Sequence, residues 1–195
     1  PRLKVLPEGL PGSAGGGSSL AQLLTADVVA FVSAEVARFS DEWLSELGGW
    51  CLGHPQIAFA SALVIGPGAR VVEAGAIIGS NAEAAPLFYD HPVYGWGFFG
   101  ASLWYRNCSA AHPWLVAMSR KVLDAAGGLP SAASWDEAFI RLCLRLRADG
   151  KRGMVDPHAR AYLDAMPPMP RSADPGFAAD PYFHPAFSSL NPLSL

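Results

Sequence analysis

The chain has 195 residues, which is enough for one domain with a sizeable core. Its net charge of −3 provides no basic field, so nucleic acid is excluded as the main partner. Only 16% of the residues are charged and 51% are hydrophobic, which predicts a surface partly covered by a missing segment, a second domain, a partner or a membrane face. The apolar run Ile57–Ile65 is far shorter than the roughly 20 residues of a membrane-spanning helix.

Short apolar stretches alternate with helix-like segments along the first half of the chain. A Gly-Pro-Gly sequence at residues 66–68 is typical of a turn between strands, and Ser40 with Glu42 predicts a helix start. Because Pro1 leads directly into a strand-like stretch, we expect the chain to be the later part of a longer protein. The expected elements are a strand at Leu3–Leu6, a glycine-rich loop at Pro7–Ser19, a helix at Ser18–Thr25, a strand at Asp27–Ser33, a helix at Asp41–Trp50, and strands at Ala58–Ile65 and Ala69–Ile78.

The second half continues the alternation after one irregular stretch. Ser80–Asn107 is rich in aromatics, glycine and proline without a clean period, so we expect a long surface excursion. The alternation of strands and helices predicts an α/β layered fold over residues 1–165, followed by a proline-rich tail at 166–195. The expected elements are a buried strand at Trp114–Met118, a helix at Ser119–Ala126 closed by Gly127 and Gly128, a helix at Trp135–Arg147, and a strand near Met154 and Val155.

Cysteine and histidine spacing indicates neither a disulfide framework nor a zinc site. Cys51, Cys108 and Cys143 are odd in number and widely spaced, which favours buried thiols in a reducing compartment. No two of the five histidines have the spacing of a helical metal site. We interpret them as structural residues, including His91 and His112, each of which precedes a proline.

Polar residues follow the apolar strand that ends near Val32. In α/β sheets, ligands bind where buried strands release polar residues at their carboxyl ends. A carboxylate there would hold a hard divalent cation, which neutralises a diphosphate. Glu35, with Ser33 beside it, is therefore a candidate metal ligand. The alternative is that the strand ends in a turn that caps a helix.

An acidic pair opens the clearest helix. Asp136 or Glu137 would serve as a general base that removes a proton from an acceptor hydroxyl, if either faces a cleft. The alternative is that Ser134 caps the helix while both acids favour the positive end of its dipole. The aromatic residues between positions 89 and 105 either stack on sugar rings or pack an apolar surface.

Taken in chain order, these segments resemble family-2-type glycosyltransferases of the GT-A fold, in particular rhamnosyltransferase-like proteins that build bacterial surface polysaccharides. The resemblance covers about residues 3–190 in the family's order and rough spacing. Its motifs are Val28–Val36 followed by Glu42-Trp43-Leu44, Ala62–Ile78 with the pair Ala74-Gly75, Trp114–Leu129 with Arg120 and Gly127-Gly128-Leu129, the run Leu142–Arg147 followed by Gly150, and Asp180–Pro185.

The resemblance implies an α/β, Rossmann-like mixed sheet flanked by helices, without the family's first nucleotide-reading strands. It implies transfer of a sugar from a nucleotide-sugar donor to a hydroxyl of a glycan or lipid-linked acceptor, with Mn²⁺ or Mg²⁺ on the diphosphate. It further implies a cytoplasmic protein, peripheral to the inner membrane, that needs a missing N-terminal segment or a partner chain. The residues it points to are Glu35 and Ser33 for the metal, Asp136 and Glu137 for the base, and Trp135 and Arg145 for the acceptor cleft, with a surface or salt-bridging role as the alternative for Arg145.

The chain departs from the family's pattern at several of these positions. The metal motif D-x-D is replaced by Ser33–Glu35, and Ala138-Phe139 stands where the family has the E-D pair that supplies its catalytic base. Asp136 lies one helical turn earlier, about 4.5 Å along the axis. Glu73 and Leu163 stand where the family often has histidines. These departures favour a second hypothesis, a degenerate and non-catalytic homologue that acts as a binding or scaffold domain.

Overall fold

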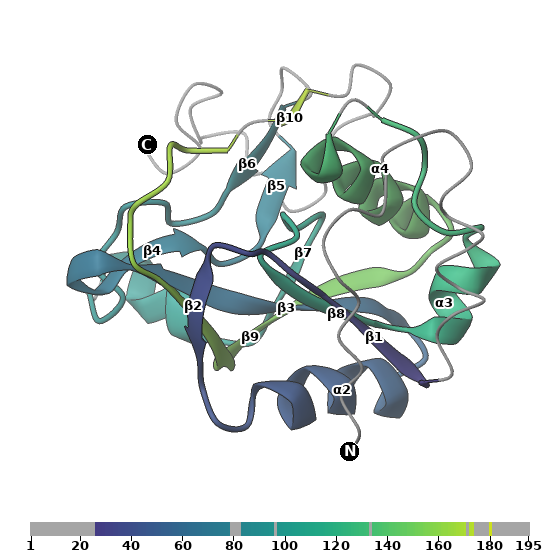
Figure 1. Ribbon diagram of the computed structural model, residues 1–195, viewed down its shortest axis with the longest axis horizontal. Helices are drawn as coiled ribbons and strands as arrows, with labels where there is room; N and C mark the ends of the chain where they lie inside the picture. Colours follow the sequence, from purple (N-terminus) through teal and green to yellow (C-terminus); the bar gives the residue numbers. More distant parts are fainter. Residues whose placement is uncertain are drawn as a thin grey trace.

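The apolar segments of the sequence form two β-sheets in the computed structural model of the protein (Figure 1). The structure describes residues 26–78, 83–95, 97–132, 134–170, 172–173 and 180. The strand and helix expected within residues 3–25 lie outside this range. So do all but Asp180 of the closing phrase at 180–185.

The larger sheet has seven strands, in the order β1-β8-β3-β9-β2, with β4 also paired to β3 and β7 to β9. Among these pairs only β3 and β9 run parallel. The strands are β1 (Val28–Val32), β2 (Val36–Phe39), β3 (Ile57–Gly66), β4 (Arg70–Glu73), β7 (Arg106–Cys108), β8 (Leu115–Ser119) and β9 (Arg152–Leu163). A smaller antiparallel sheet has the order β10-β6-β5, with β5 at Ala76–Ile78, β6 at Glu83–Pro86 and β10 at Ser172–Ala173.

Three α-helices lie within the described residues: α2 (Trp43–Gly53), α3 (Arg120–Ala125) and α4 (Trp135–Ala148). Two 3₁₀ segments, η1 (Pro67–Ala69) and η2 (Gly97–Leu103), join strands. The Ser134 hydroxyl accepts from the Glu137 amide at 3.1 Å, so the predicted cap of α4 is confirmed. The predicted cap of α2 is wrong. Ser40 instead bonds to β9, where it accepts from the Arg160 amide and donates to the His158 carbonyl.

The hydrophobic core has one part on each face of the large sheet. All ten residues of β3 are buried, and from Phe59 to Ile65 the side chains alternate between the two faces. Phe59 and Leu63 face a cluster that includes Phe139 of α4, whereas Ala60 and Ala62 face a cluster that includes Leu47 of α2. Figure 1 shows α2 and α4 on opposite sides of this sheet. None of the described helices is long and apolar enough to cross a membrane.

This architecture contradicts the expected fold class. The described residues are mostly strands in a large mixed sheet that curls until it is nearly closed, with few helices. A Rossmann-like, GT-A sheet has parallel strands covered by helices on both faces. Here β8 and β4 pair antiparallel with β3, and β2 and β7 pair antiparallel with β9, so only the β3–β9 pair has the parallel arrangement.

Two stretches whose structure was predicted wrongly contain much of the additional strand. The expected surface excursion at Ser80–Asn107 instead contains β6, η2 and β7, with buried side chains at positions 84–88 and at Val93. The expected short strand near Met154 extends over twelve residues as β9. Its Pro157 falls at a register shift, where the lost amide hydrogen bond costs little.

The predicted burial of the three cysteine thiols is confirmed. Cys51, Cys108 and Cys143 are free and buried. Burial raises the pKa of the Cys51 and Cys108 thiols to about 12, so both stay protonated at neutral pH.

Candidate functional site

The carboxyl end of β1, the segment before β8 and the start of α4 meet at one place. The Ser33 amide donates to the Trp114 carbonyl at 2.9 Å, which joins the end of β1 to the segment before β8. The Phe31 ring packs edge-on against Phe139, with centroids 5.0 Å apart, and lies 6.3 Å from the Trp135 ring. The end of β1, the segment before β8 and the start of α4 therefore lie together, although they are far apart in the sequence.

A buried carboxylate and imidazole lie beside this junction. Glu73 and His112 are 0% and 1% exposed. Both carboxylate oxygens of Glu73 accept from His112, Oε1 from its backbone amide at 2.9 Å and Oε2 from ring Nδ1 at 2.5 Å. Because a carboxylate only accepts, Nδ1 carries the proton in the neutral ring. The lone pair of that ring then lies on Nε2.

The backbone on each side of the pair fixes its position. Gly75 follows Glu73 by two residues with a φ of +75°, and a Cβ there would lie 2.6 Å from a Val155 methyl carbon. Next in the chain, Ala76 exchanges backbone hydrogen bonds with Ala110, at 2.7 and 3.2 Å. The chain thus turns sharply after Glu73 and pairs with the strand-like residues that lead to His112.

The charges around His112 favour its protonated form. Burial by itself lowers the pKa of His112, but the charge of Glu73, the hydrogen bond to it and the charge of Asp136 raise the pKa above its ordinary value. Arg106 lies near Glu73 and donates to the Ala74 carbonyl, and its pKa is lowered to about 10 by burial. The His112 imidazole is therefore a stronger base than an exposed histidine.

The other ring nitrogen of His112 has no partner. Nε2 is buried and makes no hydrogen bond within the described part of the chain. Buried polar atoms are hydrogen-bonded in the great majority of cases, so an unpaired one needs an explanation. Our interpretation of His112 as a satisfied structural residue therefore holds for Nδ1 and fails for Nε2.

The predicted metal ligands form a small turn. The Ser33 hydroxyl accepts from the Glu35 amide at 3.2 Å, and the Glu35 side chain is exposed. Within the described residues no group of three or more His, Cys, Asp or Glu side chains lies close enough to hold a metal ion. One carboxylate and one engaged hydroxyl do not make a hard-cation site by themselves, so the metal role of Glu35 and Ser33 stays a prediction.

The two predicted base residues have different surroundings. Asp136 is half-buried and close enough to His112 to raise the pKa of that histidine. Glu137 forms an ion pair with Arg141 at 2.7 Å, one turn along α4. Asp136 thus acts on His112 through its charge, whereas Glu137 is paired along its own helix, and a catalytic role for either acid stays a prediction.

The two predicted cleft residues are also separated. Trp135 is 47% exposed at the start of α4, beside Phe31. Arg145 lies near the other end of that helix and donates to the Gly128 carbonyl at 2.9 Å. This contact secures the turn after α3, and a substrate role for Arg145 stays a prediction.

Sequence reasoning named Glu73 and His112 but did not join them. They are 39 positions apart and match no spacing motif. Each offered a weak signal, since Glu73 stands at a family histidine position and His112 precedes Pro113. Only the fold brings them together.

Comparisons with known proteins give little about function. No family model matches the chain. The chain is 30% identical over 138 residues to the uncharacterized protein y4gI of Sinorhizobium fredii (strain NBRC 101917 / NGR234). The match covers 70% of this chain and spans 15% of that protein. The activity, substrates and partners of the chain are therefore proposals.

Proposed function

We propose that the chain acts in glycosyl transfer, with His112 as the base that activates an acceptor hydroxyl. The observation that carries this proposal is the buried Glu73–His112 pair with an unpartnered Nε2. A nucleotide-sugar is the proposed donor, and a glycan or a lipid-linked sugar is the proposed acceptor. We place the protein in the cytoplasm, peripheral to the inner membrane, with an N-terminal segment or a partner chain completing the nucleotide site.

The proposed chemistry begins with the neutral imidazole. Nε2 takes the proton of the acceptor hydroxyl while the acceptor oxygen forms a bond to the anomeric carbon of the donor sugar. The bond from that carbon to the nucleotide diphosphate breaks, and the diphosphate leaves with the electron pair. The resulting imidazolium is stabilised by Glu73 at Nδ1 and by the charge of Asp136.

Three features of the site support this role. Glu73 fixes both the tautomer and the orientation of the ring, as the carboxylate does in carboxylate–histidine pairs generally. The raised pKa of His112 increases its proton affinity. The exposed face of Trp135 lies at the same junction and would stack on an acceptor sugar ring.

The test measures the release of nucleoside diphosphate from UDP-, GDP- and dTDP-sugars, in the presence of glycan or lipid acceptors. The protein is the full chain, together with any residues that precede Pro1 in its reading frame. His112→Ala should lower the transfer rate by about 10²–10⁴-fold, the usual contribution of a general base. Equal rates for wild type and His112→Ala, or no release from any donor, would overturn the proposal.

Two further variants separate catalysis from folding. Glu73→Gln keeps the volume of the side chain but presents an amide to Nδ1, which holds the wrong tautomer, so it should also lower the rate. His91→Ala makes the same side-chain change as His112→Ala at another histidine before a proline, and it should leave the rate unchanged. Glu35→Ala, assayed with Mn²⁺, Mg²⁺ or EDTA, tests the metal role independently.

The second candidate function is a non-catalytic binding or scaffold domain. It is favoured by the single exposed carboxylate at the predicted metal site and by the buried Phe139, which stands where the resembling family has its catalytic base. Calorimetric titration of the protein with nucleotide-sugars and Mn²⁺ distinguishes the two functions. Absence of heat, together with absence of transfer, would favour the scaffold.

A further inference from the structure

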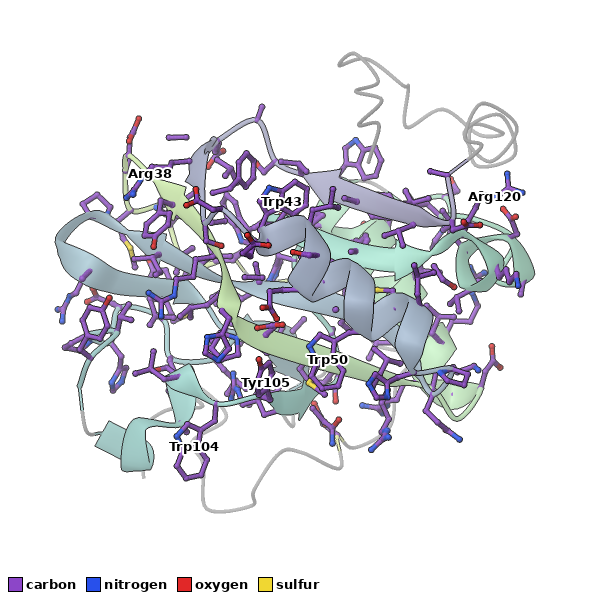
Figure 2. All side chains as sticks on the ribbon, turned by 90° about the horizontal axis from the view of Figure 1, so that it is seen from below. Arg38, Trp43, Trp50, Trp104, Tyr105 and Arg120 are labelled. Atoms are coloured by element: carbon purple, nitrogen blue, oxygen red, sulfur yellow. The ribbon has the colours of Figure 1, made fainter. Side chains whose placement is uncertain are left out.

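A row of four rings lies along one side of the molecule, at the end of α2. Trp50 lies 4.9 Å from the His54 ring and 5.4 Å from the Tyr105 ring, and Tyr105 lies 5.2 Å from the His158 ring. Figure 2 shows Trp50 and Tyr105 next to each other between α2 and the segment before β7. Tyr105 is 45% exposed and both histidines are exposed, so the row faces solvent.

Two acidic side chains lie beneath these rings. The buried Asp156 carboxylate accepts from the Trp50 indole N–H at 2.9 Å and from the backbone amides of His158 and Ala159 at 2.8 and 3.3 Å, and its charge acts on the Glu46 carboxyl group. Glu46 is one turn before Trp50 on α2, so the acid and the indole lie on the same face of the helix. Within the described residues, neither acid forms an ion pair with a lysine or an arginine.

The electrostatics of this cluster are unbalanced. Burial, the Asp156 charge and a hydrogen bond to Asp156 raise the pKa of Glu46, with a smaller contribution from Glu42, while His158 opposes the shift. Burial and the same two acids also raise the pKa of Tyr105. The negative charge thus lies near Trp50 and Tyr105, the two rings of the row whose faces are themselves electron-rich.

The cluster lies on the opposite face of the large sheet from the Glu73–His112 pair. Neighbouring residues of a strand point to opposite faces. Val155, which precedes Asp156, belongs to the core cluster on the α4 side of the sheet. Val72, which precedes Glu73, belongs to the cluster on the α2 side. Asp156 therefore points to the α2 side and Glu73 to the α4 side, so the two sites are separate.

We propose that this ring-and-acid cluster, formed by Glu46, Trp50, His54, Tyr105, Asp156 and His158, binds an organic ammonium cation. Cations are attracted to aromatic faces, and quaternary ammonium groups are bound in cages of such rings. A neutral sugar would stack on the same rings but would leave the two acids without a counter-charge. The proposal does not depend on glycosyl transfer.

The test uses choline and its neutral carbon isostere, 3,3-dimethylbutan-1-ol, with the full chain at constant ionic strength. Binding is followed by the NMR signal of the Trp50 indole N–H. Choline should shift that signal with a Kd on the order of 1 mM, because cation–π contacts at exposed sites are individually weak. The isostere should bind at least about 10-fold more weakly, since it keeps the shape and loses the charge. Equal binding of the two probes, no binding of choline, or saturation by maltotriose in place of choline would each overturn the proposal.

Variants assign the effect to the cluster. Tyr105→Ala should weaken choline binding by about 5-fold, whereas Tyr105→Phe should retain it because the ring remains. Glu46→Gln keeps the fold and the rings but removes a charge, and it should also weaken binding by about 5-fold. Tyr94→Ala is the matched control, since Tyr94 is 67% exposed and lies outside the cluster. A loss of binding in Tyr94→Ala equal to that in Tyr105→Ala would contradict the assignment.

Discussion

Two buried carboxylates of this protein, Glu73 and Asp180, have opposite kinds of surroundings. Asp180 accepts from the Ile78 amide at 2.6 Å and from the Ser109 hydroxyl at 2.5 Å, and it lies 3.6 Å from the Arg147 guanidinium. Arg147 also donates to Ser109 at 3.0 Å, so the donors around Asp180 support one another. Glu73 directs both of its oxygens at the single residue His112.

The difference separates a structural network from a candidate functional one. Around Asp180 the donors form a closed network that joins β5, the segment after β7 and the end of α4. Around Glu73 the chain of contacts ends at a ring nitrogen that has no partner among the residues the structure describes. A closed network suits stability, whereas a buried ring nitrogen without a partner needs an explanation, and we take that explanation to be functional.

The largest expected effect is the loss of stability in Glu73→Ala. Removal of the carboxylate strands two buried donors of His112, and breaking a buried pair in this way costs about 3–5 kcal/mol. Asp180→Ala should cost less, about 2–3 kcal/mol, because Arg147 and Ser109 still bond to each other. Urea unfolding of both variants measures the difference. A larger loss of stability for Asp180→Ala than for Glu73→Ala would contradict this ranking of the two carboxylates.

The next effect is steric and concerns the turn that positions Glu73. In Gly75→Ala the new Cβ would meet the Val155 and Cys108 side chains at 2.6 and 2.8 Å, in addition to the strain of a positive φ. We expect a loss of about 2–4 kcal/mol by urea unfolding. Gly150→Ala is the matched control, since its φ is +79° and no atom lies within 4 Å of the new Cβ. It should cost only about 1 kcal/mol, and equal losses would show that the space around Gly75 is not limiting.

A third, smaller effect appears only across a range of pH. The pKa of His112 is higher in the folded protein than in the unfolded chain, so its protonation stabilises the fold. That contribution is complete below about pH 6.5, the ordinary histidine value, and is lost as pH rises through the folded pKa. If His112 is a general base, activity should rise over the same interval, because catalysis needs the neutral ring.

NMR titration of the His112 ring gives its pKa in the folded protein, and unfolding measured at each pH shows whether stability falls as that ring loses its proton. Asp136→Asn removes one of the charges that raise the pKa of His112, so its titration should move to lower pH. A His112 titration below the ordinary histidine value would contradict the stated electrostatics. An unchanged midpoint in Asp136→Asn would exclude Asp136 from the site.

Local sequence predicted the elements whose signals are themselves local. The cap at Ser134 and the helix expected at Trp135–Arg147 were correctly predicted, since both depend on residues within a few positions. β3 was recognised as a continuous apolar run. These elements position the start of α4 and the centre of the sheet.

The rest depends on contacts between distant residues. β6 and β7 have no strand period of their own, and each forms by pairing with a strand elsewhere in the chain. β6 pairs with β5 in the smaller sheet, and β7 pairs with β9 in the larger one. The Glu73–His112 pair joins residues 39 positions apart. The same applies to Asp180, whose place in a resembling motif gave no hint that it bonds to Ile78. No local sequence pattern around these residues predicts either contact.

The smallest expected effect tests whether the Asp180 network is redundant. Ser109→Ala removes the hydroxyl that donates to Asp180 and accepts from Arg147. The Arg147 guanidinium, 3.6 Å from Asp180, is then free to take the vacated position, and the Ile78 amide remains in place. The loss should therefore be about 0.5–1.5 kcal/mol by urea unfolding, the net value of one hydrogen bond. A loss as large as that of Glu73→Ala would mean that Asp180, like Glu73, depends on a single partner, and the distinction between the two carboxylates would disappear.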